Sequence, residues 1–178
     1  MFKTLLIAIV AIVGLVLIYA ATRPDTFHIA RTVRIQAPPE RIYALIDSLR
    51  NFNRWNPFEK KDPNMKGTYG GPDVGPGASY AWTGEKIGVG QMIIVDNTAP
   101  SRVTMQLDFI KPFEAHNMAD FTLTPAADTP GATDVTWAMH GPSPYVSKLM
   151  EVFVSMDKMV GNDFESGLHD LKTLAEAS

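Results

Sequence analysis

Few side chains in this sequence have the type and spacing for chemistry. The chain has no cysteine, which excludes thiol catalysis, disulfides and cysteine-based metal sites. No serine stands in the strand–turn–helix setting of a nucleophile elbow. The histidines show neither the i, i+4 nor the His-x-His spacing of metal ligands; they are His28, His116, His140 and His169. We therefore expect no catalytic triad, no metal centre and no cofactor.

Asp163 is the charge with the greatest chemical interest. On a helical projection it falls in an apolar sector, between the directions of Met156 and Met159. A carboxylate there must find a partner or shift its pKa. A protonated Asp163 could serve as a general acid or orient a ligand hydroxyl, with Tyr80 as a second catalytic candidate. The structural alternative, which we favour, is a bond to a strand residue or an arginine, the candidates being Tyr80, Trp82, Trp137, Arg31 and Arg54.

A long amphipathic helix is predicted over Pro144–Ala175, and it must position Asp163. Its apolar residues recur at steps of three and four, which places them on one face; they are Tyr145, Leu149, Val152, Phe153, Met156, Val160, Phe164, Leu171 and Leu174. Ser143 is the predicted N-cap, with Pro144 in the first turn. Gly167 lies on the apolar face, and we interpret it as a close contact with a sheet.

Alternating patterns predict the sheet that this helix covers. Val103, Met105, Leu107 and Phe109 alternate with polar residues, and similar patterns occur at 28–36, 78–96, 117–123 and 135–139. The short connections between the later segments predict consecutive antiparallel strands. His116 and Asp120 fall on the side of their strand opposite Phe121, so we expect them to face solvent. Two short helices are predicted between Pro38 and Trp55.

The first part of the chain predicts a membrane anchor. Thr4–Ala21 contains no charge and is close to the length of about 20 residues that crosses a bilayer. A cleaved signal peptide is the alternative, although its apolar region would be shorter. We expect an anchor at 1–21, a linker at 22–27 and one ligand-binding domain at 28–178. The domain is expected outside the cytoplasm, in the periplasm, as part of a single-pass membrane protein.

Charge and glycine content exclude two further classes of partner. The net charge is −3 and the basic residues form no run, which argues against nucleic-acid binding. The glycine-rich stretch 67–77 lacks the lysine and hydroxyl residue of a phosphate-binding loop, and no helical pattern follows it. We interpret this stretch as turns with one short strand around 67–71.

Three segments carry a resemblance to a known family. They are IQAPPERIYALIDSLRNFNRWNPF (35–58), ATDVTWAMHGP (132–142) and MDKMVGNDFESGLHDLK (156–172). In this order they resemble the START-like helix-grip superfamily, in its polyketide cyclase/dehydrase (SRPBCC) branch, and the third is similar to membrane-anchored or signal-bearing bacterial members. The resemblance implies an α+β fold in which a curved antiparallel sheet wraps a long C-terminal helix. The predicted transmembrane helix would precede that fold.

The resemblance also implies an apolar ligand, a small molecule or a lipid, between the sheet and the last helix. The predicted lining is aromatic and methionine-rich, with one carboxylate: Trp55, Tyr80, Trp82, Met105, Phe109, Phe121, Trp137, Met139, Met156, Met159 and Asp163. Our leading hypothesis is non-catalytic binding by a membrane-tethered domain. Two alternatives stay open, an enzyme of the cyclase/dehydratase kind and a protein-interaction module whose pocket is plugged by its own side chains.

Overall fold

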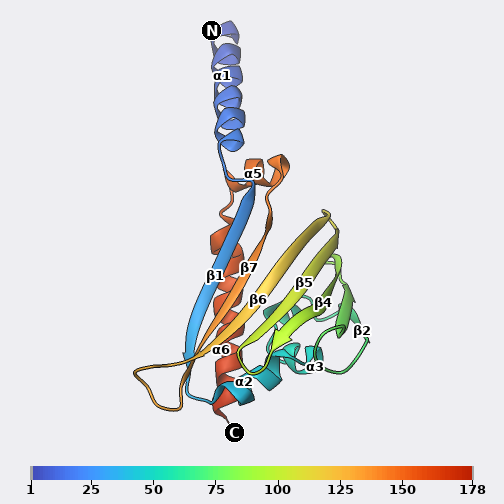
Figure 1. Ribbon diagram of the computed structural model, residues 1–178. Helices are drawn as coiled ribbons and strands as arrows, with labels where there is room; N and C mark the ends of the chain where they lie inside the picture. The colour runs from blue at the N-terminus through green and yellow to red at the C-terminus, as the bar shows by residue number, and fades with distance from the viewer. Residues whose placement is uncertain (1, 178) are drawn as a thin grey trace.

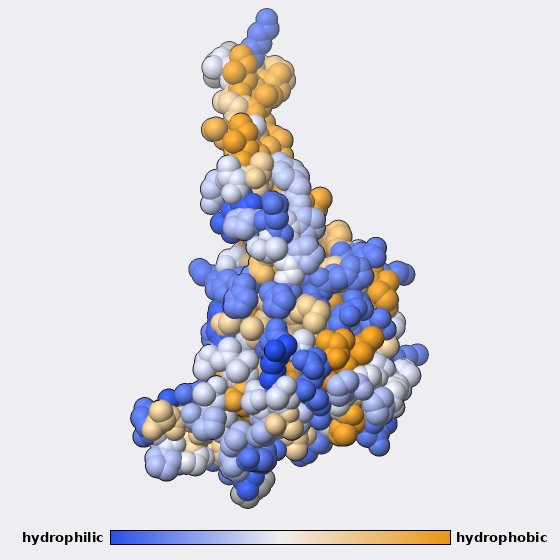
Figure 2. Space-filling model, viewed as in Figure 1, coloured by the Kyte–Doolittle hydropathy of each residue, from blue (hydrophilic) through white to orange (hydrophobic). Residues whose placement is uncertain are grey.

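The computed structural model describes residues 2–177. Its first element is the apolar helix α1 (Phe2–Ala21), which projects from the rest of the molecule and has nearly all of its side chains exposed (Figure 1). The helix is long and apolar enough to cross a membrane, a property that signal sequences share. Figure 2 shows it as a hydrophobic column above a mostly hydrophilic surface.

A seven-stranded antiparallel sheet forms the body of the domain, in the order β1-β7-β6-β5-β4-β3-β2. The strands are β1 (Thr26–Ile35), β2 (Lys66–Gly70), β3 (Ser79–Thr83), β4 (Val89–Thr98), β5 (Arg102–Lys111), β6 (Ala115–Pro125) and β7 (Thr133–Pro142). Burial alternates along β7, where Val135, Trp137 and Met139 are buried on the inner face. The predicted α+β arrangement of a curved sheet around a C-terminal helix is confirmed.

Helices cover one face of this sheet. The three short ones are α2 (Pro39–Ile46), α3 (Leu49–Phe52) and α4 (Pro57–Lys61), and the long one is α6 (Met156–Glu176). Helix α6 runs along β1, with Phe164, Leu168 and Leu171 buried against the core. Figure 1 shows α2 and α3 at the end of the sheet opposite α1.

The predicted continuous helix over Pro144–Ala175 is wrong in one respect, because it is two helices. Helix α5 (Tyr145–Glu151) ends in bonds of the i→i−3 kind, from the amides of Val152 and Phe153 to carbonyls of the helix. Ser155 then caps α6 by accepting a bond from the Lys158 amide at 3.3 Å. The apolar spacing continues through the break, so periodicity alone could not reveal it.

The predicted capping role of Ser143 is also wrong. Pro144 occupies the N-cap position of α5 without a side-chain cap. Ser143 instead links the segment after β7 to the linker before β1, since its amide donates to the Asp25 carbonyl at 2.7 Å. Its hydroxyl is buried and has no hydrogen-bond partner among residues 2–177.

The predicted close contact at Gly167 is confirmed. A Cβ atom at this position would lie 2.9 Å from the ring of Trp137 and 2.9 Å from Pro57 Cδ. Gly161, six residues earlier on α6, makes room in the same way for the guanidinium of Arg31. These two glycines let α6 lie directly on the inner face of the sheet.

Candidate functional site

A cavity of about 420 Å³ opens at the end of the domain that faces α1. It lies between the linker, the first residues of β1 and the junction of α5 with α6, and its lining residues are Arg23, Pro24, Thr26, Phe27, His28, Ile29, Glu151, Ser155, Met156 and Asp157. This volume falls within the range of about 300–1,000 Å³ that is typical of small-molecule sites. The cavity therefore has the size of a ligand site.

The cavity combines an apolar wall with charged residues. Phe27 and Ile29 lie on the same side of β1 as Arg31, which contacts α6, and Met156 is the first residue of α6. The charged residues Arg23 and Glu151 form an ion pair at 3.3 Å. This mixture suits an amphiphilic ligand better than a purely apolar one.

Arg31 organises the α6 side of the cavity. Its guanidinium contacts the Asp157 carboxylate at 3.0 Å and the Glu165 carboxylate at 2.7 Å. The hydrogen bond from Arg31 holds the pKa of Asp157 below its usual value. Asp157 therefore stays ionised at neutral pH, and the start of α6 is fixed against β1.

Several predicted lining residues instead pack against one another in an aromatic core. Trp137 stacks on Phe164 with ring centroids 4.0 Å apart, and its ring lies 5.6 Å from that of Trp55 and 5.0 Å from that of Phe121. All four side chains are buried. This cluster fixes α6 and the α3–α4 segment to the middle of the sheet.

The remaining predicted apolar residues lie partly in the buried core and partly at the surface. Met105, Met139 and Trp82 are buried, and Trp82 packs edge-to-face on Phe109 with centroids 5.8 Å apart. Met159 is half exposed. Of the predicted set, Met156 is the residue that lines the 420 Å³ cavity.

Asp163 and Tyr80 both bond to α4. Asp163 pairs with Lys61 at 2.6 Å, so its partner is none of the residues predicted for it. Tyr80 donates its hydroxyl hydrogen bond to Glu59 at 2.5 Å, and burial, followed by that carboxylate, raises its pKa. The lysine was missed because α4 is only five residues long and leaves little periodic signal. The contacts give both catalytic candidates a structural role in holding α4.

Replacing Asp163 with asparagine tests that structural role. We expect Asp163→Asn to lower the free energy of unfolding by less than about 1 kcal/mol, because the Lys61 side chain is 46% exposed and exposed ion pairs contribute little. Ligand binding should be unchanged. Chemical unfolding followed by circular dichroism checks stability, and Lys61→Met should give a similar loss. A much larger loss of stability, or a loss of binding, would contradict this assignment.

Two buried polar atoms on the inner face have no partner within residues 2–177. They are Asn117 Oδ1 on β6 and Trp137 Nε1 on β7. The Asn117 side chain lies against Gly141, which pairs with the cavity residue Phe27 across β1 and β7. Buried polar groups are normally hydrogen-bonded, so these atoms are candidates for contact with a ligand or with water. A lone asparagine in an alternating strand offered no signal of this in the sequence.

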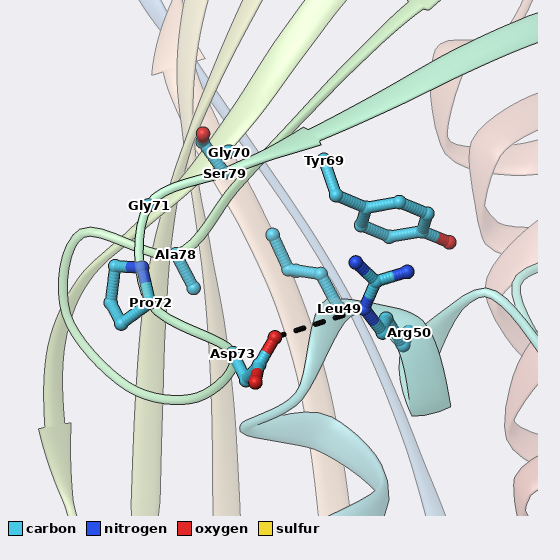
Figure 3. A pocket seen from close by; sticks show the side chains of 9 residues that line it. All are labelled: Leu49, Arg50, Tyr69, Gly70, Gly71, Pro72, Asp73, Ala78 and Ser79. Atoms are coloured by element: carbon cyan, nitrogen blue, oxygen red, sulfur yellow. Dashed lines mark ion pairs between the residues drawn. The ribbon is translucent and has the colours of Figure 1, made fainter.

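A second, smaller pocket lies beside the glycine-rich turns (Figure 3). Its volume is about 60 Å³, enough for only a few water molecules. Arg50 lies over the Tyr69 ring at 4.4 Å and reaches Asp73 at 3.8 Å. Because its arginine is already engaged, this pocket resembles a packed turn, and we do not treat it as a ligand site.

The predicted solvent-facing side of β6 carries a polar network. His116 is 64% exposed and bonds to Asp108 at 2.7 Å, while Asp120 contacts His140 at 3.2 Å. Among residues 2–177 no group of three histidine, aspartate or glutamate side chains could hold a metal ion. The network lies on the outer face of the sheet, opposite the buried Phe121.

This network predicts a pH dependence of stability. The bond to Asp108 raises the pKa of His116 above 6.5, and the bond to His116 lowers the pKa of Asp108 below 3.8. The pair therefore contributes fully between these two values, and its contribution is lost as pH rises through the folded-state pKa of His116. We expect His116→Asn to lower the urea midpoint at pH 5.5, and the difference from the unmodified chain to vanish by pH 9. An equal difference at both pH values would contradict this.

Comparisons with known proteins agree with this architecture. A family model described as polyketide cyclase / dehydrase and lipid transport matches residues 26–176. A search of curated proteins found no match. Among solved structures, a hypothetical protein from Helicobacter pylori is similar at TM-score 0.62 and 6% identity, over 88% of this chain and 92% of that one.

Two further structures show the same fold. Ginseng major latex-like protein 151 from Panax ginseng is similar at TM-score 0.60 and 12% identity, over 85% of this chain and 99% of that one. A protein from Mycobacterium smegmatis is similar at TM-score 0.58 and 22% identity, over 86% and 93% of the two chains. Identities this low establish the fold alone. The match over nearly the whole domain shows that this chain belongs to the polyketide cyclase/dehydrase and lipid transport family.

Proposed function

We propose that this protein binds an amphiphilic small molecule or lipid without catalysing a reaction, in a domain tethered to a membrane. The 420 Å³ cavity with its apolar wall and charged residues is the observation that carries the proposal. The family description includes lipid transport, which supports this class of ligand. The ligand's apolar part would lie against Phe27, Ile29 and Met156, with its polar group near Arg23 and Glu151.

The inner face of the sheet extends this site toward the residues predicted from the sequence. Ile29 pairs with Met139, and Met139 pairs with Ala119 on the next strand. A longer ligand would therefore pass from the cavity toward Met139 and the unpartnered Asn117 side chain. We propose that the remaining predicted residues contribute where such a ligand extends further along the inner face of the sheet; they include Trp82, Met105, Phe109 and Met159.

The tether and its orientation belong to the same proposal. Residues 1–21 would anchor the chain, 22–27 would link it and also border the cavity, and 28–178 would form the ligand-binding domain outside the cytoplasm. A tethered domain keeps its cavity at high effective concentration relative to molecules dissolved in the bilayer. The enzyme alternative requires Asp163 or Tyr80 to act on a ligand, but both bond to α4.

Replacing Met156 with glutamate tests the site. Met156 is the first residue of α6, where a negative charge is compatible with the helix dipole, so the fold should tolerate the change. A carboxylate in the cavity would lose solvation against an apolar ligand, and we expect occupancy to fall at least about tenfold. Asn162→Glu places the same charge on the exposed face of α6 and serves as the matched control.

Native mass spectrometry with organic extraction of the full chain measures this occupancy. The unmodified chain and Asn162→Glu should carry one reproducible amphiphile that Met156→Glu lacks. Lipids that merely adhere to α1 would remain in all three samples, so the comparison separates them from a ligand in the cavity. The proposal fails if the unmodified chain carries no such molecule, or if Met156→Glu carries as much of it.

A further inference from the structure

Helix α5 and the three residues that follow it carry an exposed apolar stripe. Val146, Met150, Phe153 and Val154 are 63%, 52%, 74% and 52% exposed. Val146 and Met150 lie one turn apart on α5, and Phe153 and Val154 continue the stripe into the segment between α5 and α6. Four large apolar side chains on one short segment form an exposed apolar surface. Other exposed apolar residues, among them Ile110 and Phe113, lie elsewhere on the domain, and Figure 2 shows apolar patches on its body as well.

The other side of α5 is fixed to the end of α1. Tyr145 donates a hydrogen bond to the Leu17 carbonyl of α1 at 2.9 Å. The buried Lys148 pairs with Asp25 at 2.5 Å, and Glu151 pairs with Arg23. The polar groups of α5 are thus used against α1 and the linker, which leaves the apolar stripe pointing away from them. Figure 1 shows α5 at the base of α1.

The length of α1 determines where α5 would lie in a membrane. A helix of 20 residues is about 30 Å long, which equals the thickness of the hydrocarbon core. A spanning α1 therefore ends at the membrane surface, with no spare residues to lift α5 away from it. An amphipathic segment at this depth can bury its apolar face at the boundary between headgroups and acyl chains.

We propose that the stripe of Val146, Met150, Phe153 and Val154 is a second membrane contact, seated in the surface of the bilayer that α1 spans. This inference rests on the proposed tether, and it adds a docking surface to it. The stripe is continuous with the cavity, because Glu151 and Ser155, which flank Val152–Val154, both line it. The seated segment places the opening of the cavity against the lipid, so an amphiphile enters from the bilayer without crossing water.

The absence of cysteine allows a direct test with single labels on the full chain. Phe153→Cys, Ile12→Cys and Val74→Cys are each labelled with the polarity-sensitive fluorophore NBD and reconstituted in phosphatidylcholine vesicles. Ile12 lies in α1, and Val74 is 56% exposed in a loop near α2, at the other end of the sheet. Lipids carrying a doxyl quencher on the acyl chain then report which labels reach the bilayer, and circular dichroism confirms the fold of each variant.

The proposal expects loss of fluorescence at positions 12 and 153 and none at 74. Quenching at 12 with position 153 behaving like 74 would overturn this contact and leave the tether standing. No quenching at 12 would overturn the tether, and the contact with it. A blue-shifted label at 153 that the doxyl lipids do not quench would show that protein covers the stripe, which also overturns the proposal.

Discussion

Replacing Trp137 with alanine is expected to lower the free energy of unfolding by about 4 kcal/mol, as large-to-small changes in an aromatic core do. Trp137 is 4% exposed and contacts the rings of Phe52, Trp55, Phe121 and Phe164, from α3, the segment after it, β6 and α6. Removing the indole leaves a cavity where these elements meet. Urea unfolding of the full chain in detergent, followed by far-ultraviolet circular dichroism, measures the loss.

Trp137→Phe is the informative companion to this variant. The phenyl ring keeps the stack on Phe164, whose centroid lies 4.0 Å from that of Trp137. The indole nitrogen has no hydrogen-bond partner within residues 2–177, so its removal breaks no hydrogen bond to the protein. The cost should stay below about 1.5 kcal/mol. Equal losses for alanine and phenylalanine would contradict the importance of the stack and point to a partner on the nitrogen.

Replacing Gly167 with leucine is expected to cost about 3 kcal/mol, because overpacking forces the backbone or the neighbouring rings to move. A Cβ at this position would already lie 2.9 Å from both Trp137 and Pro57, and neither ring can rotate away freely. Leucine would lift α6 from β7 and disturb α4. The same measurement of unfolding applies.

Ser166→Leu is the matched control for this substitution. Ser166 is exposed and adjacent to Gly167 on α6, so leucine there gains helix propensity without a clash. Its stability should change by less than about 0.5 kcal/mol. Similar losses for both variants would show that leucine disturbs the helix itself and would contradict the close contact at Gly167.

Patterns with a fixed period made most of the fold predictable. Two patterns predict which side of an element is buried. They are the alternation of Val103, Met105, Leu107 and Phe109 and the helical spacing of Phe164 and Leu171. Gly167 was identifiable because a glycine on an apolar helix face has little other purpose. Phe121 and Trp137 of the aromatic core lie on predicted strand faces and Phe164 on the predicted helix face, whereas Trp55 follows a short helix and has no periodic signal.

The candidate site was less predictable, because it depends on junctions between elements. The break after α5 is invisible to periodicity, and the cavity forms around that break and the linker. The pairing of Asp163 with Lys61 spans 102 residues and depends on how α4 docks, which no local pattern encodes. Met156 was predicted as a lining residue, whereas Phe27 was assigned to the linker and Ile29 to a strand, and neither was predicted to line a site.

The contacts that join α5 to the linker have a mechanical consequence. Three contacts hold the domain in a fixed orientation against α1. They are the ion pairs Lys148–Asp25 and Arg23–Glu151 and the hydrogen bond from Tyr145 to the Leu17 carbonyl. A domain on a flexible linker would sample many orientations relative to α1, whereas a domain held by these contacts moves together with α1. In a bilayer its encounters with ligand would then be governed by lateral diffusion. The opening of the cavity would stay at a fixed distance from the membrane surface.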